Sequence, residues 1–293
     1  MIFVAIDLFC GGGGATKGLI DAGFEVILSI DCWEEALILH EANFPESDIL
    51  DLKLGGDIEP LVNLVKSKLI MFESEEIHLH CHGSPPCQEI SNASNHDSKD
   101  GMNMVFWFIE FVEALNPNSW SMENVQPIDH LLPLDIDRFL FNSADFGVPQ
   151  VRKRIFAGFG FNHMPTHRKN QWVSIKEAIP DIEGDLEACP SMEGRWHELS
   201  IHKPFPTITS ASPKQIRINN EGQRRTLSLR EIAILSGWGD MVIPEQLRNE
   251  DLFQIIGNMV SPPVMEAIGR SIIESRKKNV KFTKQMRLFK QGD

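Results

Sequence analysis

The first 31 residues constrain the fold more than any other part of the chain. Residues 2–9 form an apolar run that predicts a buried strand. Four glycines at 11–14 then turn the chain, and residues 15–22 predict a helix. A second strand is predicted over 25–30, and it finishes at Asp31. A strand, a glycine turn, a helix and a second strand are the beginning of a doubly wound α/β sheet.

The alternation of strands and helices continues through the first half of the chain. The segments that we predict are helices over 34–43 and 101–115 and strands over 77–82 and 119–122. A hairpin is predicted within 143–161, with residues 154–159 as one arm. From about residue 161 the composition and the periodicity of the sequence change. Residues 161–215 are rich in Pro, His and Trp and lack a long periodic segment. Two further helices are predicted, over 229–235 and 262–273.

Composition excludes several classes of protein. The chain has 293 residues, 42% of them hydrophobic and 24% charged, as in ordinary soluble globular proteins. No apolar run approaches the roughly 18 residues that span a bilayer, and the N-terminus lacks the basic leader of a secretory signal. The five cysteines are scattered and form no C-x-x-C pair, which argues against a disulfide framework and a structural zinc site. We expect a protein of a reducing cytosol with no membrane partner.

The two halves of the chain carry opposite charge. Residues 1–149 hold 6 Lys and Arg against 25 Asp and Glu, a net charge of −19. Residues 150–293 hold 22 Lys and Arg against 16 Asp and Glu, a net charge of +6. Such asymmetry indicates a surface for a polyanion on the basic side. A solvated helix face followed by a frayed tail is the alternative for the basic C-terminal end.

One cysteine lies in a rigid, polar loop. Pro85 and Pro86 fix φ at two successive positions and end the preceding strand. Cys87 follows directly, so its thiol is presented at a strand end on a stiffened backbone. A free cysteine is more often buried in the core, but the polar neighbours Gln88 and Ser91 argue against that alternative. We therefore interpret Cys87 as a nucleophile.

The glycine run and two acids form a candidate nucleoside site. Glycines between a strand and a helix let a ligand approach backbone N–H groups, although a simple tight turn is the alternative for such a run by itself. The dinucleotide pattern G-x-G-x-x-G fails, because Thr16 or Lys17 stands where its third glycine is needed. Asp31 follows the loop by about 20 residues, where an acid accepts ribose hydroxyls. Asp57 and Ile58 suit an adenine edge, with the carboxylate on the amine and the apolar side chain on the ring.

In this order the segments resemble those of the cytosine-C5 DNA methyltransferases, and the resemblance runs from residue 2 to about residue 273. The matching segments are D-L-F-C-G-G-G-G at 7–14, S-I-D at 29–31, G-D-I at 56–58, P-P-C-Q at 85–88, E-N-V at 123–125, F-G-V-P-Q-V-R-K-R at 146–154, P-T-I-T at 206–209 and Q-I-I-G-N-M-V-S-P-P at 254–263. A single tetrapeptide has little weight, but eight segments in the family's order are specific.

The resemblance implies S-adenosylmethionine as cofactor, leaving as S-adenosylhomocysteine, and no metal. It also implies a Rossmann-like doubly wound methyltransferase sheet with a small irregular target-recognition domain. The catalytic and cofactor-binding domain then comprises residues 1–160 and 252–293, and the recognition domain comprises 161–251. Phe9 is expected to lie against the adenine. The cofactor-binding residues that we expect are Asp7, Phe9, Gly11, Gly13, Asp31, Asp57, Ile58, Pro85, Asn258 and Val260.

The resemblance also implies a mechanism by covalent catalysis on a flipped cytosine. Cys87 is expected to add to C6 of the ring, which makes C5 nucleophilic towards the methyl group. Glu123 is expected to hold N3 and the 4-amino group and to act as a general acid at N3. Arg154 is expected to contact O2, where negative charge develops, and Arg152 to brace the loop around Cys87. A cationic neighbour would also help the thiol to ionise.

Double-stranded DNA is the partner that the resemblance implies. The residues that we assign to DNA contact are Gln88, Ser91, Arg195, Lys203, Thr207, Thr209, Lys214 and Arg217. The recognition region is short for the family, with chiefly residues 181–203 left to read bases, so specificity is short, relaxed or dependent on a partner. Whether a restriction endonuclease accompanies the protein stays open. We expect a monomer in a prokaryotic cytosol, associated with the nucleoid or encoded by a phage.

Three rival functions remain as alternatives. An RNA (tRNA) cytosine methyltransferase shares the fold, but its expected Cys-Phe-Thr segment is not found. A nicotinamide oxidoreductase is disfavoured by the failed glycine pattern, and a catalytically silent DNA-binding relative by the presence of Cys87 and Glu123 with Arg154. Three alternating histidines at 78, 80 and 82 invite a metal interpretation, but without a fourth ligand nearby they are better explained as a polar strand face.

Overall fold

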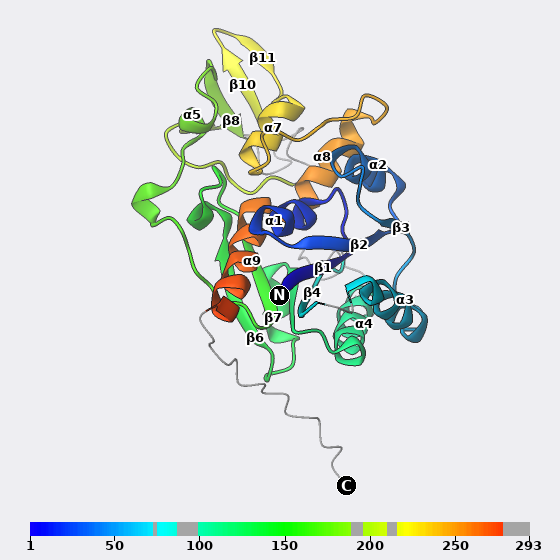
Figure 1. The fold of residues 1–293 in the computed structure, drawn as a ribbon. Helices are drawn as coiled ribbons and strands as arrows, with labels where there is room; N and C mark the ends of the chain where they lie inside the picture. The colour runs from blue at the N-terminus through cyan, green and yellow to red at the C-terminus, as the bar shows by residue number, and fades with distance from the viewer. Residues whose placement is uncertain (73–74, 87–98, 189–195, 210–215, 278–293) are drawn as a thin grey trace.

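The computed structural model describes residues 1–72, 75–86, 99–188, 196–209 and 216–277. Seven strands form one sheet in the order β3-β2-β1-β4-β5-β7-β6 (Figure 1). Their bounds are β1 (Ile2–Leu8), β2 (Glu25–Asp31), β3 (Ile49–Asp51), β4 (Ile77–Gly83), β5 (Ser119–Asn124), β6 (Asp137–Asn142) and β7 (Lys153–Phe159). The first five strands in this order run parallel, and β7 runs antiparallel to both of its neighbours. The doubly wound α/β fold is thereby confirmed.

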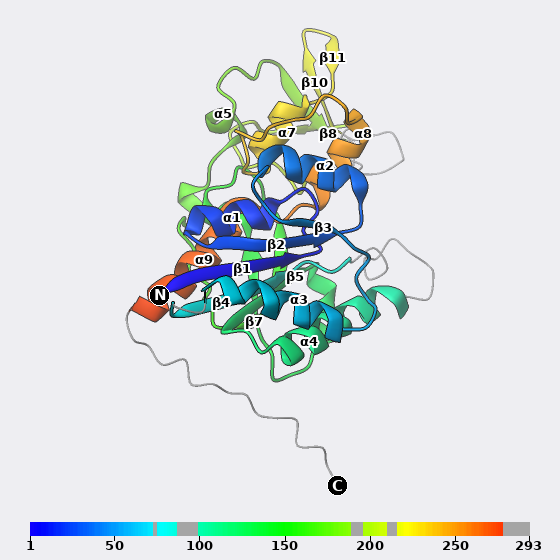
Figure 2. The ribbon, with the colours of Figure 1, turned by 45° about the vertical axis from the view of Figure 1, so that its right-hand side comes forward.

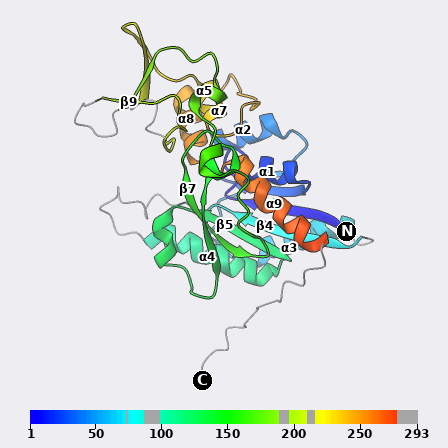
Figure 3. The same cartoon turned by 90° about the vertical axis from the view of Figure 1, so that its left-hand side faces the viewer.

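Helices cover both faces of this sheet (Figure 3). Helices α3 (Glu59–Leu69) and α4 (Lys99–Leu115) pack on one face, and α1 (Gly14–Ala22) and α9 (Pro262–Lys277) pack on the other. The alternation along β1 explains the two cores, since side chains of a strand point to opposite faces in turn. Val4 and Ile6 belong to the core under α3 and α4, whereas Ala5 belongs to the core under α1 and α9.

The end of the chain returns to the beginning, because α9 packs directly along α1 (Figure 1). Glycines permit this close approach: a Cβ on Gly18 of α1 would lie 2.4 Å from the carbonyl oxygen of Pro262, and one on Gly269 would lie 2.6 Å from Cβ of Ala22. The last predicted helix is therefore confirmed, and it extends to Lys277.

A second, smaller sheet lies above the first in Figure 2. Its strands run antiparallel in the order β11-β10-β8-β9. Their bounds are β8 (Asp185–Ala188), β9 (His197–Leu199), β10 (Ile216–Asn220) and β11 (Gln223–Arg225), and the helices nearby are α5 (Ile175–Ala178), α7 (Leu229–Leu235), α8 (Asn249–Asn258) and α2 (Glu34–Asn43). Apolar side chains from all four helices and from β8 and β10 form one core. Since α2 and α8 share this core, the division of the chain into two domains stays a prediction.

Local sequence explains where the short helices begin. Ser228 caps α7 by accepting a hydrogen bond from the backbone of Glu231, whose carboxylate accepts one from the backbone of Ser228. Ser174 and Glu177 form the same capping box at α5. Such a reciprocal pair satisfies two backbone donors that the first helical turn leaves open. The remaining turns are the 3-10 helices η1 (Ile70–Phe72), η2 (Gln126–His130), η3 (Ser143–Phe146) and η4 (Lys169–Gln171).

Two predictions need correction. The predicted hairpin has β7 as one arm, but its other arm is β6, which ends at Asn142, before the predicted segment starts. The recognition region is more regular than predicted, because β8 to β11 pair into a sheet although each has only three to five residues. Strands this short show no period that a sequence window can detect. Within the described ranges no helix is long and apolar enough to cross a membrane.

Candidate active site

The loop after β1 begins with a strained residue. Phe9 has φ of +57°, a left-handed conformation that bulky residues rarely adopt. Two hydrogen bonds from Ser84 hold this turn: its backbone N–H donates to the carbonyl of Leu8 at 3.1 Å, and its hydroxyl donates to the carbonyl of Phe9 at 2.9 Å. Ser84 directly follows β4, so the loop after β4 is fastened to the loop after β1. Strain that is held in this way is typical of functional sites.

The glycines at 11–14 have different neighbours. A Cβ on Gly12 would lie 2.6 Å from Ile255, and one on Gly14 would lie 2.2 Å from the carbonyl oxygen of Val260. These glycines are needed because α8 and the segment between α8 and α9 pack closely against the loop. Gly11 is different, since a Cβ there would meet no heavy atom within 4 Å. The open side of the loop therefore lies at Gly11, which is where a ligand can approach the backbone.

Asp31 lies at the end of β2 and holds the glycine loop. Its Oδ2 accepts a hydrogen bond from the backbone N–H of Gly11 at 2.8 Å. Its Oδ1 accepts from the N–H groups of Cys32 at 2.7 Å and Trp33 at 3.0 Å. A carboxylate offers about four lone-pair positions, so these three bonds leave capacity on a side chain that is partly exposed. Asp31 is thus placed to support the loop and to accept from a ligand.

Two aromatic side chains, Phe9 and Trp107, pack beside this loop. The ring of Phe9 meets the ring of Trp107 edge to face, with centroids 6.1 Å apart. The indole N–H of Trp107 donates to the carbonyl of Gly56 at 2.7 Å, which places the next residues, Asp57 and Ile58, on the same side. Asp57 is exposed and Ile58 is half-buried. Sequence reasoning missed Trp107; as a tryptophan in an apolar helix it carried no distinguishing signal.

Asp7 lies beneath the loop rather than in its open side. Its side chain is fully buried, and its Oδ2 accepts a hydrogen bond from the Thr16 hydroxyl at 2.7 Å. The same hydroxyl lies 3.1 Å from Nε2 of His40. Burial raises the pKa of Asp7 to about 7, against the lowering effect of the Thr16 hydrogen bond. The structure thus brings Asp7 to the site as a support for α1 from below.

The nucleophile loop starts within the same cluster. Pro85 is buried, and its carbonyl accepts a hydrogen bond from the Asn124 side chain at 3.1 Å. Asn124 ends β5, so the start of this loop is held between the ends of β1 and β5. Cys87, Gln88 and Ser91 lie outside the described residues. Their predicted roles therefore stay predictions from the sequence.

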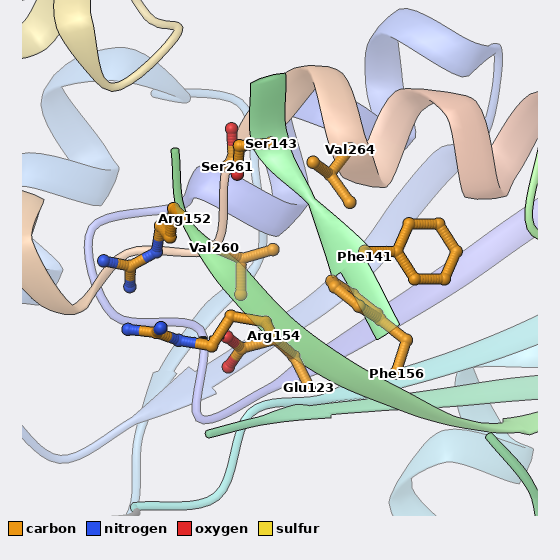
Figure 4. Close-up of a pocket in the computed structure, with 9 residues that line it drawn as sticks. All are labelled: Glu123, Phe141, Ser143, Arg152, Arg154, Phe156, Val260, Ser261 and Val264. Atoms are coloured by element: carbon orange, nitrogen blue, oxygen red, sulfur yellow. Dashed lines mark ion pairs between the residues drawn. The ribbon is translucent and has the colours of Figure 1, made fainter. Parts of the chain in front are cut away.

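Glu123 and Arg154 face each other across β5 and β7 (Figure 4). The Arg154 Nε lies 3.1 Å from Oε1 of Glu123. Glu123 is 7% exposed. Burial raises the pKa of its carboxyl, and the nearby charges of Arg154 and Arg152 oppose that rise. A carboxyl whose pKa is raised in this way is suited to hold and deliver a proton.

Arg152 has a structural position. It is buried, and its Nη1 donates to the carbonyl of Ile208 at 3.0 Å and to the carbonyl of Gly257 at 2.9 Å. These bonds join the residue before β7, the segment between β9 and β10, and the end of α8. Figure 4 shows its guanidinium on the same side as that of Arg154. These contacts involve backbone outside the Cys87 loop, so the bracing of that loop by Arg152 stays a prediction.

A small cavity lies among these side chains. It is lined by Glu123, Phe141, Ser143, Arg152, Arg154, Phe156, Val260, Ser261 and Val264 (Figure 4). About 10 Å³ of it is accessible to the centre of a water molecule, which is room for about one water. Val260 is buried against this cavity, whereas Asn258 at the end of α8 is exposed. The last predicted motif therefore contributes one wall of the site.

The predicted DNA-contact residues spread over the segment that joins the two sheets and over the second sheet. Lys203 and Thr209 are exposed, and the Thr207 hydroxyl donates to the carbonyl of Val151 at 2.8 Å. Thr207 thus fastens its own segment to the start of β7 in addition to any contact with a substrate. Arg195 and Lys214 lie outside the described residues.

Arg217 is held rigidly on β10. Its Nε donates to Oε2 of Glu187 on the neighbouring strand at 2.6 Å, and its guanidinium lies 3.7 Å above the ring of Trp196. The Glu187 carboxylate also accepts from the Asn219 side chain at 3.2 Å. Glu187 is an unpredicted partner, since two residues on separate short strands give no signal in sequence. An arginine oriented in this way presents its remaining N–H groups in a fixed direction.

The alternating histidines of β4 have serines as partners. Each of the three imidazoles lies within 3.1 Å of a hydroxyl of Ser119 or Ser121. This agrees with their interpretation as a polar strand face. In the described part of the chain no group of three or more His, Cys, Asp or Glu is arranged to hold a metal ion.

The residues near Gly11 suit an adenosyl ligand. The open space at Gly11 is a cradle that a side chain would fill. Phe9 and Ile58 offer apolar surfaces, Asp57 offers an exposed carboxylate, and Asp31 ends the neighbouring strand. Ligands bind in α/β sheets outside the carboxyl ends of the parallel strands, and all of these residues follow β1, β2 or β3. The donor set thus fits the cofactor that the sequence implies.

Comparisons with known proteins agree on the kind of protein that this chain resembles. A family model described as C-5 cytosine-specific DNA methylase matches residues 3–131. The Type II methyltransferase M.HgiDI of Herpetosiphon aurantiacus is 33% identical over 227 residues, which cover 69% of this chain and 70% of the relative. The Type II methyltransferase M.HindV of Haemophilus influenzae is 27% identical over 312 residues, covering 94% and 98%.

A solved structure supports the same fold. The Entamoeba histolytica methyltransferase EhMeth matches with a TM-score of 0.71 and 16% sequence identity, and the match covers 94% of this chain and 99% of that one. The fold therefore extends over both sheets.

Proposed function

The chain belongs to the C-5 cytosine-specific DNA methylase family, and we propose that it transfers the methyl group of S-adenosylmethionine to C5 of a cytosine that is flipped out of double-stranded DNA. The observation that carries this proposal is the convergence of two loops and one ion pair. The glycine loop after β1, the Pro85 turn after β4 and the Glu123–Arg154 pair meet at the carboxyl ends of the parallel strands.

Three named residues act on the cytosine ring in the proposed reaction. The Cys87 thiolate adds to C6 of the cytosine, and Glu123 delivers a proton to N3 as the ring loses its aromaticity. Arg154 stabilises the negative charge at O2. S-adenosylmethionine supplies the methyl group and leaves as S-adenosylhomocysteine. A base then removes the C5 proton, the electron pair of that C–H bond expels Cys87 as a thiolate, and N3 returns its proton to Glu123 as the aromatic ring is restored.

In the proposed complex the guanidinium of Arg154 has two partners, the Glu123 carboxyl and O2 of the cytosine. It lies beside Glu123, and its positive charge favours the ionised form of that carboxyl. When a cytosine enters, its O2 competes for the guanidinium, and the Glu123 carboxyl is released to hold a proton against N3. Entry of the base therefore shifts Glu123 towards its acid form.

The basic second half, with Lys203 and Arg217, is proposed to face the DNA backbone. The relatives are named Type II methyltransferases, which supports the proposal that this chain modifies defined sites in a restriction-modification context. We place its activity in the prokaryotic cytosol, where such DNA is accessible.

Incubation with radiolabelled S-adenosylmethionine tests the proposal, with duplex DNA and tRNA in parallel and bisulfite sequencing of the DNA. Cys87→Ser is expected to abolish label, whereas Cys189→Ser, a matched change in the recognition region, is expected to retain it. A duplex with 5-fluorocytosine is expected to trap a covalent adduct at Cys87 in the wild type. Label on tRNA alone, or undiminished label with Cys87→Ser, would contradict the proposal.

A further inference from the structure

Three histidines on β4 and two serines on β5 form a continuous ladder of hydrogen bonds between the strands. His78 Nε2 lies 2.8 Å from Ser119 Oγ, which lies 2.9 Å from His80 Nδ1. His80 Nε2 lies 3.1 Å from Ser121 Oγ, which lies 2.8 Å from His82 Nδ1. All five side chains are buried. The ladder runs in the strand direction, so it ends at the carboxyl edge of the sheet where the site lies.

All three imidazoles are neutral in the folded protein. Burial lowers the pKa of His78 to about 4 and the pKa of His82 to about 3, and it places the pKa of His80 well below its usual range. A neutral imidazole has one nitrogen that donates and one that accepts. The ladder therefore has a direction, which is set by the tautomer of each ring.

Arg276 sets that direction at the outer end. Its Nε lies 3.0 Å from Nδ1 of His78. A guanidinium has donors only, so Nδ1 must accept and His78 must carry its proton on Nε2. Ser119 then accepts from His78 and donates to His80. Ser121 repeats the pattern, accepting from Nε2 of His80 and donating to Nδ1 of His82, so each polar atom as far as that Nδ1 is satisfied.

The opposite direction is excluded by the same contact. It requires a proton on Nδ1 of His78, which would face the Arg276 N–H as donor against donor. In the allowed direction His82 accepts from Ser121 through Nδ1 and carries its proton on Nε2. That N–H has no hydrogen-bond partner among the described residues, although it is fully buried. A buried donor without a partner costs about 1–3 kcal/mol, so a partner is expected.

Asp7 offers the complementary atom. Asp7 on β1 and His82 on β4 are paired in register, so their side chains leave the same face of the sheet. The Oδ2 of Asp7 is occupied by Thr16, whereas its Oδ1 is buried and has no partner in the described part of the chain. One water between Nε2 of His82 and Oδ1 of Asp7 would accept from the first and donate to the second.

We propose that Arg276 is a positioning residue for the cofactor loop: through the ladder it makes His82 a donor, and His82, through one buried water, favours the ionised form of Asp7, whose Oδ2 anchors Thr16 and α1 beneath the glycines. The consequence for the cofactor rests on the proposed function, whereas the direction of the ladder does not. No residue of the ladder touches a substrate. The C-terminal end of α9 is thereby coupled to the opposite end of the sheet.

Imidazole tautomers give the direct test. In protein labelled with ¹⁵N-histidine, long-range ¹H–¹⁵N spectra are expected to report an Nε2–H tautomer for His78, His80 and His82. Arg276→Met removes the outer donor and is expected to mix the tautomers, beginning at His78. Arg276→Lys restores a donor and is expected to restore the wild-type pattern. Ser121→Ala cuts the ladder internally and is expected to release His82 while His78 keeps its tautomer.

Calorimetric titration with S-adenosylhomocysteine gives the second readout. Arg276→Met is expected to raise Kd about threefold to tenfold, the range of one hydrogen bond in a network, and Arg276→Lys to bring Kd back. Lys277→Met is the matched control, because Lys277 is the next residue of the same helix and its side chain is exposed. It is expected to leave both readouts at the wild-type value.

The outcomes separate this inference from the proposed function. An Nδ1–H tautomer at any of the three histidines in the wild type would overturn the ladder, whatever the protein methylates. Unchanged tautomers in Arg276→Met would overturn the role of Arg276. Wild-type protein that shows the expected tautomers but does not bind S-adenosylhomocysteine would contradict the proposed function and leave the ladder supported. Mixed tautomers together with an unchanged Kd would overturn the coupling to the loop.

Discussion

Arg154 and Glu123 lie on antiparallel neighbours, β7 and β5, with the Nε of the arginine 3.1 Å from Oε1 of the glutamate. The pair stands at the rim of a cavity with room for about one water, so a cytosine has to widen the space between the two side chains as it enters. Both partners are thereby placed to change their contacts when substrate binds.

Replacing the acid tests this pair. Glu123→Gln keeps the size of the side chain but removes the proton that the carboxyl would deliver to N3. We expect kcat to fall about 10²-fold to 10⁴-fold, the range for loss of a general acid, with the Kd for S-adenosylhomocysteine within about twofold of the wild type. Single-turnover methylation with radiolabelled cofactor measures the first and calorimetry the second. Turnover at the wild-type rate would show that Glu123 does not deliver the proton to N3.

Replacing Arg152 is expected to affect mainly stability, whereas replacing Arg154 is expected to affect mainly turnover. Arg152 is buried and serves the carbonyls of Ile208 and Gly257, so Arg152→Met leaves two buried acceptors without donors and is expected to lower the free energy of unfolding by about 2–4 kcal/mol. Arg154 is partly exposed, and Glu123 can take up a proton when the guanidinium is lost, so Arg154→Met is expected to lower stability by less than Arg152→Met and to reduce turnover. Urea denaturation and methylation assays on both variants decide this; equal losses of stability would contradict it.

Two glycines of the same loop form a second matched pair. A Cβ on Gly14 would lie 2.2 Å from the carbonyl oxygen of Val260, so Gly14→Ala is expected to destabilise the fold by about 3 kcal/mol or more. Gly11→Ala meets no atom within 4 Å, and only its φ of +51° opposes alanine, at a cost of about 1–2 kcal/mol. Its methyl group instead enters the proposed cofactor site, so we expect Kd for S-adenosylhomocysteine to rise about tenfold (about 1.4 kcal/mol). Tight binding by Gly11→Ala would place the cofactor elsewhere.

The buried histidines predict a loss of stability in acid. Burial lowers the pKa of His78 to about 4 and that of His82 to about 3, whereas unfolded histidine titrates near pH 6.5. The unfolded state then binds more protons, so stabilisation is complete above pH 6.5 and is lost as the pH falls towards 4. At pH 5 we expect a loss of about 2 kcal/mol per histidine relative to pH 7.5.

His78→Gln isolates this effect. Glutamine can accept from Arg276 and donate to Ser119, so it keeps the contacts of the ladder but does not titrate. The slope of unfolding free energy against pH is expected to be shallower in this variant between pH 7.5 and 5. Asp7 is unchanged in both proteins and therefore cancels, although its pKa, raised by burial to about 7, works in the opposite direction. Identical slopes would show that His78 is not the titrating group.

Local patterns were sufficient for the long elements. The apolar run of β1, the glycines after it and the capped α7 all lie within a window of ten residues or so, where periodicity and turn chemistry act. Elements of three to five residues, such as β3 and β8, were not predicted, because pairing with a distant strand is what makes them strands. For the same reason the prediction placed the first arm of the hairpin after residue 142, whereas the strand that pairs with β7 is β6.

The class of fold, the order of the motifs and the residue types of the site could be predicted from the sequence, because each depends on residues that are contiguous in the chain. Which side chains contact each other became known only from the folded structure. It placed Asp7 beneath the glycine loop, paired Arg217 with Glu187 and joined Arg276 to His78, nearly 200 positions earlier. A hydrogen bond or a buried ion pair depends on atoms within about 3.5 Å of each other. Packing brings such atoms together from segments that are far apart in the sequence, and no local pattern in either segment indicates that they will meet.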